Sequence, residues 1–99
     1  FFQKFDLLLT PSLAVPAFDV GHLQPPGSAP DDTYWMDWTP FTFPFNLSQQ
    51  PACSIPCGFT KDGLPVGLQI VADNFREDLV LRAAKAFEMI RPMDRCPDL

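Results

Sequence analysis

The chain has 99 residues, which suits one small domain and not two, and its 46% hydrophobic content argues against disorder. No apolar run is long enough to span a bilayer, so we expect no contact with a membrane. The net charge of −5 comes without any basic cluster that could follow a phosphate backbone, so nucleic acid is not an expected partner.

The start of the chain and its cysteines bear on origin and compartment. The chain begins without Met and has Asp6 where a secretory signal would continue its apolar core, so we expect a piece of a longer protein that lacks such a signal. Cys53, Cys57 and Cys96 form an odd set, which predicts reduced thiols in the cytoplasm. His22 is the single histidine, so four soft metal ligands cannot be assembled, and we expect neither a metal nor a cofactor.

The first predicted element is a strand over Asp6–Thr10, an apolar run that reads as buried. A long connection rich in Pro and Gly follows over residues 11–32, and long connections are usually functional or poorly ordered. Next comes a stretch dense in aromatic rings, in which Pro40 and Pro44 allow only short helical turns. These rings either fill a core or wall a substrate cleft: Tyr34, Trp35, Trp38, Phe41, Phe43 and Phe45.

Two further strands are predicted over Ala52–Pro56 and Val66–Ala72, joined as a hairpin with a long tip. Asp62-Gly63 within that tip is a strong turn signal, because glycine takes positive φ without steric cost. Gly67 inside the second of these strands predicts a bulge or a close approach of another part of the chain.

The last predicted element is a helix from about Phe75 to Ile90. Asn74 is expected to cap it, with Glu77 three residues later as the reciprocal partner. Pro92 is expected to end it. Apolar residues recur at helical spacing and form one face: Val80, Ala83, Ala84, Phe87 and Ile90.

One strand, a hairpin and a helix laid on the sheet predict an α/β arrangement, with residues 1–99 forming a single partial domain. Three strands and one helix leave an open sheet edge, which seeks another strand. We therefore expect either self-association or pairing with the remainder of a larger domain.

The residues alone assemble no complete active site. Serine catalysis needs a base and oxyanion donors beside the nucleophile, and no serine lies in a Gly-x-Ser-x-Gly elbow. A lone loop histidine such as His22 is more often a solvated bystander. Cys57 has Lys61 as its only evident neighbouring cation, so a small core residue is the more frequent role than a reactive thiolate.

Three stretches, read together, resemble the C-terminal end of the amidase signature family. They are Asp6–Ala14 (DLLLTPSLA), Phe41–Phe59 (FTFPFNLSQQPACSIPCGF) and Asp62–Val71 (DGLPVGLQIV). They occur in the family's order, and the expected helix follows them. The resemblance covers roughly Phe5 to Pro92, and the string GLPVGLQ is its most specific part.

The resemblance implies a hydrolase that cleaves carbon–nitrogen amide bonds, other than peptide bonds, in a small-molecule substrate through an acyl-enzyme. Its fold would be a large mixed sheet with helices on both faces, of which this chain would supply about three strands and one helix. The family's two serines and lysine lie upstream of this region, and Lys4, Lys61 and Lys85 do not match that lysine. No catalytic residue is therefore carried over, the Ser-Ser-Lys triad is expected to be absent, and we expect the chain to be inactive alone.

The resemblance also implies roles for matched residues. The family segment that corresponds to Trp38, Phe41 and Phe43 passes near the substrate cleft, so these three are candidates for a pocket wall. The remaining motif residues are read as structural, with Asn46 expected to tie loop backbone just before a strand. They are Asn46, Pro56, Gly58, Gly63, Pro65, Gly67 and Gln69.

Two departures from the family pattern bear on function. Gln49 stands where the family often has glycine, so the local turn is expected to differ. Thr39 falls about where glutamine-using transfer-RNA amidotransferases carry an aspartate for the ammonium group of glutamine. This favours a general amidase over a component of such an amidotransferase, which stays an alternative within the family. A second alternative is a stand-alone, non-catalytic module that oligomerises through its exposed sheet edges.

Overall fold

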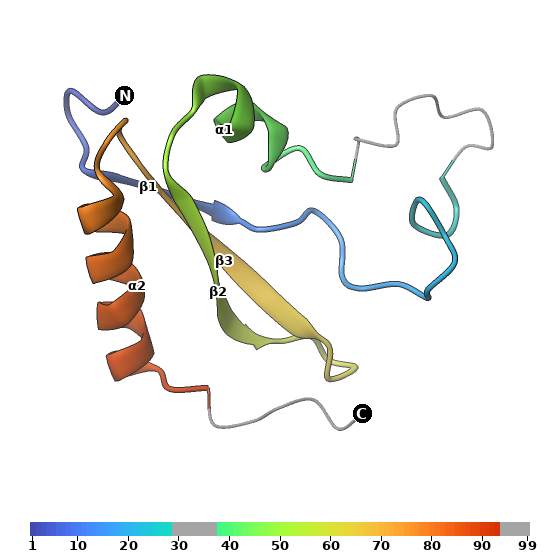
Figure 1. The fold of residues 1–99 in the computed structure, drawn as a ribbon. Helices are drawn as coiled ribbons and strands as arrows, with labels where there is room; N and C mark the ends of the chain where they lie inside the picture. The colour runs from blue at the N-terminus through green and yellow to red at the C-terminus, as the bar shows by residue number, and fades with distance from the viewer. Residues whose placement is uncertain (29–37, 94–99) are drawn as a thin grey trace.

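The fold is a three-stranded antiparallel sheet with two helices, seen in a computed structural model that describes residues 1–28 and 38–93 (Figure 1). The strands are β1 (Leu7–Pro11), β2 (Ala52–Phe59) and β3 (Pro65–Ala72), and the helices are α1 (Phe43–Ser48) and α2 (Glu77–Ile90). The strand order is β1-β3-β2, so the last strand in the sequence is the central one. The α/β arrangement expected from the sequence, with a C-terminal helix on the sheet, is confirmed.

The hairpin of β2 and β3 has a shorter tip than the sequence suggests, because pairing continues out to Phe59 and Pro65. The turn is closed by two backbone hydrogen bonds, from Thr60 N–H to the Leu64 carbonyl at 2.8 Å and from Gly63 N–H to the Thr60 carbonyl at 3.1 Å. Gly63 has φ of +82°, so the Asp-Gly turn signal is confirmed. A bulge lies at Cys57 on β2, and not at Gly67.

Strand β1 pairs with β3 over Leu7↔Ala72 to Pro11↔Leu68 and forms one edge of this sheet. The expectation of a buried strand is wrong in this respect, since Leu9 is 56% exposed. An edge strand has one unpaired side, and proline, which has no N–H to donate, is tolerated there. Pro11 accordingly lies within the strand, whereas the sequence predicts it just after the end.

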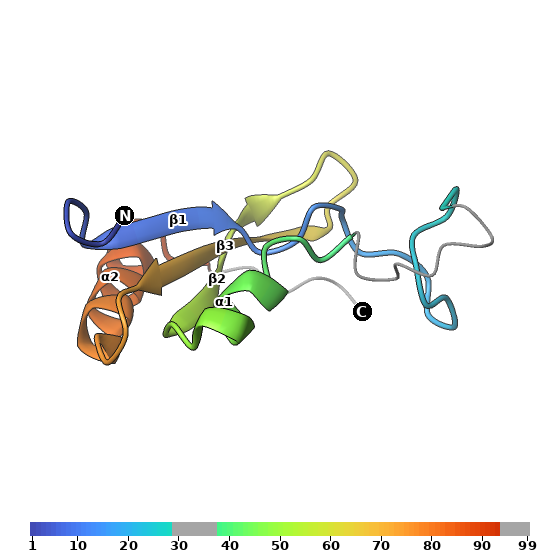
Figure 2. The same ribbon diagram turned by 90° about the horizontal axis from the view of Figure 1, so that it is seen from above.

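The core is centred on β3. Ile70 and Val71 are adjacent and therefore point to opposite faces of the sheet, yet both are almost fully buried. Both faces of β3 are thus covered at this point. Helix α2 packs on β2 and β3 and contributes Val80, which is 3% exposed. Figure 1 shows α2 running alongside the sheet, and Figure 2 shows α2 and α1 at separate places along it.

Helix α2 begins two residues later than expected, and the predicted cap at Asn74 is wrong. The cap residue is Arg76, which makes no side-chain cap bond. The Asn74 N–H is instead bonded to the Asp73 carboxylate at 2.9 Å, and Phe75 has φ of +63°. The chain therefore makes a turn between the end of β3 and the start of α2. As a result, the predicted capping box of Asn74 and Glu77 does not form. The C-terminal end at Ile90 is as predicted.

The end of the aromatic-rich stretch lies in α1, a helix of six residues with proline in its first turn, as the spacing of prolines predicts. Part of that stretch, including Tyr34 and Trp35, lies outside the described residues, as do the end of the long connection and Cys96. No helix in the described part of the chain is long and apolar enough to cross a membrane.

Candidate functional site

The aromatic segment that enters α1 is anchored to the loop after β1. The Trp38 ring meets the Phe18 ring edge to face, with centroids 5.3 Å apart. The Ala14 N–H also points at the Trp38 carbonyl oxygen, at 3.5 Å. The indole N–H of Trp38 is buried without a hydrogen-bond partner among the described residues. Such a donor is costly to leave unpaired, so Trp38 is held there by packing.

Gln69 joins the same segment to the sheet. Its side chain is 9% exposed, and its amide nitrogen donates to the Phe41 carbonyl oxygen at 2.7 Å and to the Thr10 hydroxyl at 2.9 Å. A buried amide needs such partners, because desolvation without them costs free energy. Gln69 therefore fixes the position of the Phe41 backbone relative to β3. It links β3 to β1 and to the segment that precedes α1.

Of the three candidate wall residues, Trp38 and Phe41 are half-buried and lie against the loop and the sheet, while Phe43 opens α1 and is 37% exposed. The structure therefore holds the first two in place by contacts, and Phe43 follows on the helix. Their role as a pocket wall stays a prediction.

A pair of serine hydroxyls, which no sequence pattern connects, lies across the central strand. The Oγ atoms of Ser12 and Ser54 are 2.6 Å apart, although 42 positions separate the residues. They meet above Gly67, whose carbonyl oxygen accepts the Ser12 N–H at 2.9 Å. A Cβ at Gly67 would lie 2.5 Å from Ser12 Oγ and 2.9 Å from Ser54 Oγ, so only glycine leaves room for the pair. The expected close approach at Gly67 is confirmed.

Beside the serine pair lies a hollow of about 430 Å³ between the loop after β1 and the start of β3. Among the described residues, its lining is apolar apart from two hydroxyl groups, those of Ser12 and Thr60, and includes no charged residue. The Thr60 Oγ1 accepts the Leu64 N–H at 3.1 Å, so its own hydrogen can be donated elsewhere. The volume falls within the range of small-molecule pockets.

The other motif residues have structural positions. Asn46 lies inside α1, where its N–H points at the Thr42 carbonyl at 3.3 Å, and not immediately before a strand as expected. Pro56 faces Gly67 across the hairpin, and Gly58 follows the bulge. Pro65 opens β3.

Gln49 occupies the position where the family often has glycine. It follows α1 with φ of +58° and ψ of +28°, in the left-handed region that favours glycine. The turn thus has the geometry that suits glycine, and Gln49 adopts it with some strain. That this turn differs from the one in the family stays a prediction.

The thiols and the histidine gather into no reactive centre among the described residues. Burial raises the pKa of the Cys53 thiol, which disfavours thiolate. The Cys57 S–H points at the Val66 carbonyl at 3.4 Å, in keeping with a structural role. His22 is exposed in the loop after β1. Within residues 1–28 and 38–93, no three side chains of the metal-binding types come together.

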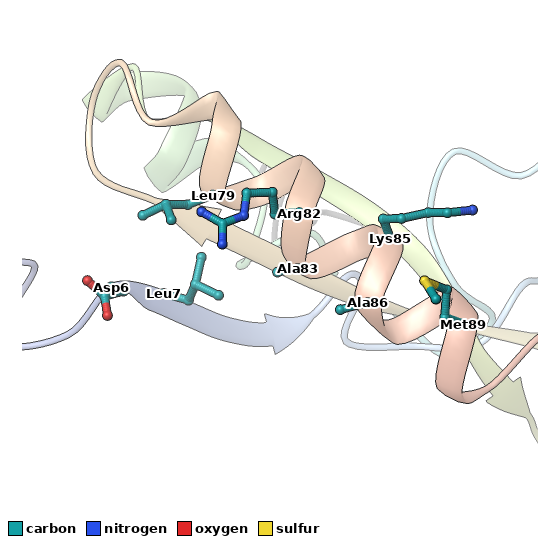
Figure 3. Close-up of a pocket in the computed structure, with 8 residues that line it drawn as sticks. All are labelled: Asp6, Leu7, Leu79, Arg82, Ala83, Lys85, Ala86 and Met89. Carbon is teal, nitrogen blue, oxygen red and sulfur yellow. The ribbon is translucent and has the colours of Figure 1, made fainter.

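An open groove of about 570 Å³ runs between β1 and α2 (Figure 3). Leu7 projects from the strand toward the helix, and Ala83 and Ala86 face it from α2. The lining is mostly apolar and is completed by Leu79, Met89, Asp6, Arg82 and Lys85. It follows that the uncovered edge of the sheet is continuous with an uncovered apolar stripe of the helix.

Comparison with known proteins gives a consistent family. The family model described as amidase matches residues 1–81. The chain is 43% identical over 94 residues to an acylamidase of Rhodococcus erythropolis, and 48% identical over 87 residues to the A component of the glutamyl-tRNA(Gln) amidotransferase of Myxococcus xanthus. These alignments cover 93% and 88% of this chain but 20% and 17% of the two relatives. The chain thus spans a fifth or less of the length of the curated relatives it matches.

Solved structures agree with this assignment. The A component of the Thermotoga maritima glutamyl-tRNA(Gln) amidotransferase superposes with a TM-score of 0.76 at 36% identity, over 95% of this chain and 19% of that one. A 6-aminohexanoate cyclic dimer hydrolase superposes with a TM-score of 0.75 at 36% identity, over 89% of this chain and 20% of that one. A bacterial aryl acylamidase of the amidase signature enzymes also matches, with a TM-score of 0.72. With its family match, its relatives and its fold in agreement, the chain belongs to the amidase signature family.

Proposed function

We propose that this chain is the C-terminal part of an amidase domain whose complete protein hydrolyses carbon–nitrogen amide bonds through an acyl-enzyme. The observation that carries the proposal is the match of the amidase model to residues 1–81, with relatives named as an acylamidase and an aryl acylamidase. A small-molecule amide is the substrate class, no cofactor takes part, and the protein works in the cytoplasm.

The chain's own residues supply scaffold and cleft wall. A serine nucleophile needs a base beside it, but the partner of Ser12 in this structure is the hydroxyl of Ser54, which is no base at neutral pH. Lys85 lies 3.8 Å from the Glu88 carboxylate on the exposed side of α2, where it is poorly placed to relay a proton. These contacts support the expectation that the Ser-Ser-Lys triad of the complete enzyme comes from outside this chain.

The open edge of β1 and the groove beside it suit a contact with the rest of the amidase domain. Apolar side chains of the groove, such as Leu7 and Met89, gain most from being covered by another element. Self-association is the alternative for the chain on its own. Native mass measurement across protein concentration separates the two: a monomer at all concentrations counts against self-association.

General amide hydrolysis is favoured over the supply of ammonia from glutamine, because Thr39 carries no charge with which to hold the ammonium group of glutamine. The relatives include components of amidotransferases, so this choice needs its own test. Replacing Thr39 by Asp in the complete protein should raise glutamine hydrolysis relative to aryl amide hydrolysis. A general amidase without this charge should show little glutamine hydrolysis before the change.

The test of the proposal is an assay of the complete protein against this chain alone. The complete protein should release aniline from acetanilide, and the purified 99-residue chain should release none above the rate in buffer. Trp38→Ala and Phe41→Ala in the complete protein should raise KM more than they lower kcat, with the exposed Leu81→Ala as control. Turnover by the chain alone that survives repurification, or no turnover by the complete protein on any amide, would contradict the proposal.

A further inference from the structure

We infer that the hollow beside the Ser12–Ser54 pair is a binding subsite for an uncharged, largely apolar group that carries one hydrogen-bond acceptor. In the proposed amidase, this group is a part of the amide substrate away from the bond that is cleaved. The inference rests on the proposed function only for the identity of that substrate, since binding itself is a property of the hollow.

The lining decides the charge of the ligand. The hollow is walled by Leu13, Val15, Pro16 and Val66, and no acidic or basic side chain among the described residues lines it. A charged ligand group would lose its hydration there without gaining a partner, which is unfavourable. An uncharged group gains the burial of its apolar surface instead. The hollow therefore favours neutral over ionised ligands.

The serine pair decides the polar contact. Two hydroxyls have two hydrogens, and the 2.6 Å contact between Ser12 and Ser54 uses one of them. When Ser54 is the donor, the remaining hydrogen belongs to Ser12, the member of the pair that lines the hollow. The pair thus offers one donor to a ligand oxygen, strengthened by the bond that Ser12 accepts. Thr60 offers a second hydroxyl across the hollow.

The strands hold this donor in place before any ligand arrives. Ser12 is fixed through its N–H to the Gly67 carbonyl at 2.9 Å, and Ser54 belongs to β2 on the other side of β3. The missing side chain of Gly67 is what lets the two hydroxyls meet. A donor that is bonded to both β3 and β2 loses little freedom on binding, which is the advantage of preorganisation.

The binding experiment uses methyl-labelled protein, so it works on the 99-residue chain and on the complete protein. Acetophenone, benzoate and ethylbenzene serve as probes, because they share a phenyl ring and differ in charge and in the acceptor oxygen. We expect acetophenone to shift the methyl signals of Leu13, Val15 and Val66 with Val80 unchanged, and to bind more tightly than benzoate or ethylbenzene. Shifts elsewhere only, or benzoate binding as well as acetophenone, would overturn the inference.

Substitutions of serine test which hydroxyl group donates the hydrogen bond to the ligand. Ser12→Ala should weaken acetophenone binding about fivefold, the usual value of one neutral hydrogen bond, and should leave ethylbenzene binding unchanged. Ser48→Ala is the matched control, because that exposed hydroxyl lies on α1 and contacts Gln50. A loss for both probes would show that Ser12 acts by packing alone. Normal acetophenone binding in a complete protein that hydrolyses no amide would contradict the proposed function and leave the subsite intact.

Discussion

The side-chain amide of Gln69 donates a hydrogen bond to the main-chain oxygen of Phe41, at 2.7 Å and across 28 positions of the sequence. The same nitrogen donates to the hydroxyl of Thr10 on the neighbouring strand. One buried nitrogen thus sets the position of the aromatic segment relative to the sheet, and any part that this segment takes in substrate binding depends on it.

Replacing Gln69 by Met should lower the free energy of unfolding by about 1–3 kcal/mol, because the Phe41 carbonyl and the Thr10 hydroxyl lose a donor inside the protein. Urea denaturation followed by tryptophan fluorescence measures the change. Gln3→Met is the control, since Gln3 is exposed in the N-terminal turn and should change stability little. Equal changes in the free energy of unfolding at the two positions would show that the hydrogen bonds of Gln69 make no net contribution to stability.

Replacing Gln49 by Gly should raise the free energy of unfolding by about 0.5–1 kcal/mol. The gain comes from the removal of strain at φ of +58°, reduced by the greater freedom of glycine in the unfolded chain. The control is Gln50→Gly at the next residue, whose N–H closes the end of α1 onto the Phe45 carbonyl without a positive φ. That change should destabilise. A loss of stability in both variants would rule out strain at Gln49.

Replacing Val80 by Ala should lower the free energy of unfolding by about 2 kcal/mol, because two buried methyl groups are lost from the contact between α2 and the sheet. Leu81→Ala, one position along the same helix, should cost far less, since Leu81 is 66% exposed. Thermal unfolding followed by circular dichroism compares the two. Should Leu81→Ala be as costly as Val80→Ala, another part of the protein covers the outer face of α2.

The start of α2 should respond to acid. The hydrogen bond from Arg76 at 2.9 Å, helped by the opposite charge of that residue, holds the pKa of Asp78 below its ordinary value. A carboxyl whose folded pKa is depressed stabilises the fold above its unfolded pKa, about 3.9, and this contribution is lost as pH falls through the folded pKa.

Asp78→Asn should therefore lower stability at about pH 7 and have little effect near pH 2, with a difference that shrinks in high salt because both partners are exposed. Urea unfolding at the two pH values measures this. Asp19→Asn, in the loop after β1, is the reference substitution. A penalty for Asp78→Asn that stays constant between the two pH values would contradict an electrostatic origin.

Much of the fold could be predicted from local pattern. The strand over Val66–Ala72, the Asp62-Gly63 turn and the helix that ends at Ile90 each depend on neighbours within a few residues, and each forms as predicted. The predicted apolar face of α2 is buried at Val80, whereas its last member, Ile90, is 80% exposed. The predicted start of α2 is wrong for a local reason as well, because the bond between the Asp73 carboxylate and the Asn74 N–H competes with the expected cap.

The contacts at the candidate site could not be predicted in the same way, because they depend on the order of the strands in the sheet. Ser12, which follows β1, and Ser54 on β2 meet only because β3 lies between these two strands and has glycine at the crossing point. The close approach at Gly67 was predictable from glycine within a strand, but its two partners were not. The family's frequent glycine at the position of Gln49 was the one sequence signal that marked a strained turn.

The order β1-β3-β2 has a consequence for the growing chain. Strand β2 can form its hairpin with β3 as soon as the nearby turn closes, whereas β1 must wait for a partner that begins only at Pro65. Pairings between distant segments form slowly, since a long loop must be closed first. During synthesis on the ribosome, the leucines of β1 therefore wait for their β3 neighbours until almost the whole sheet has emerged.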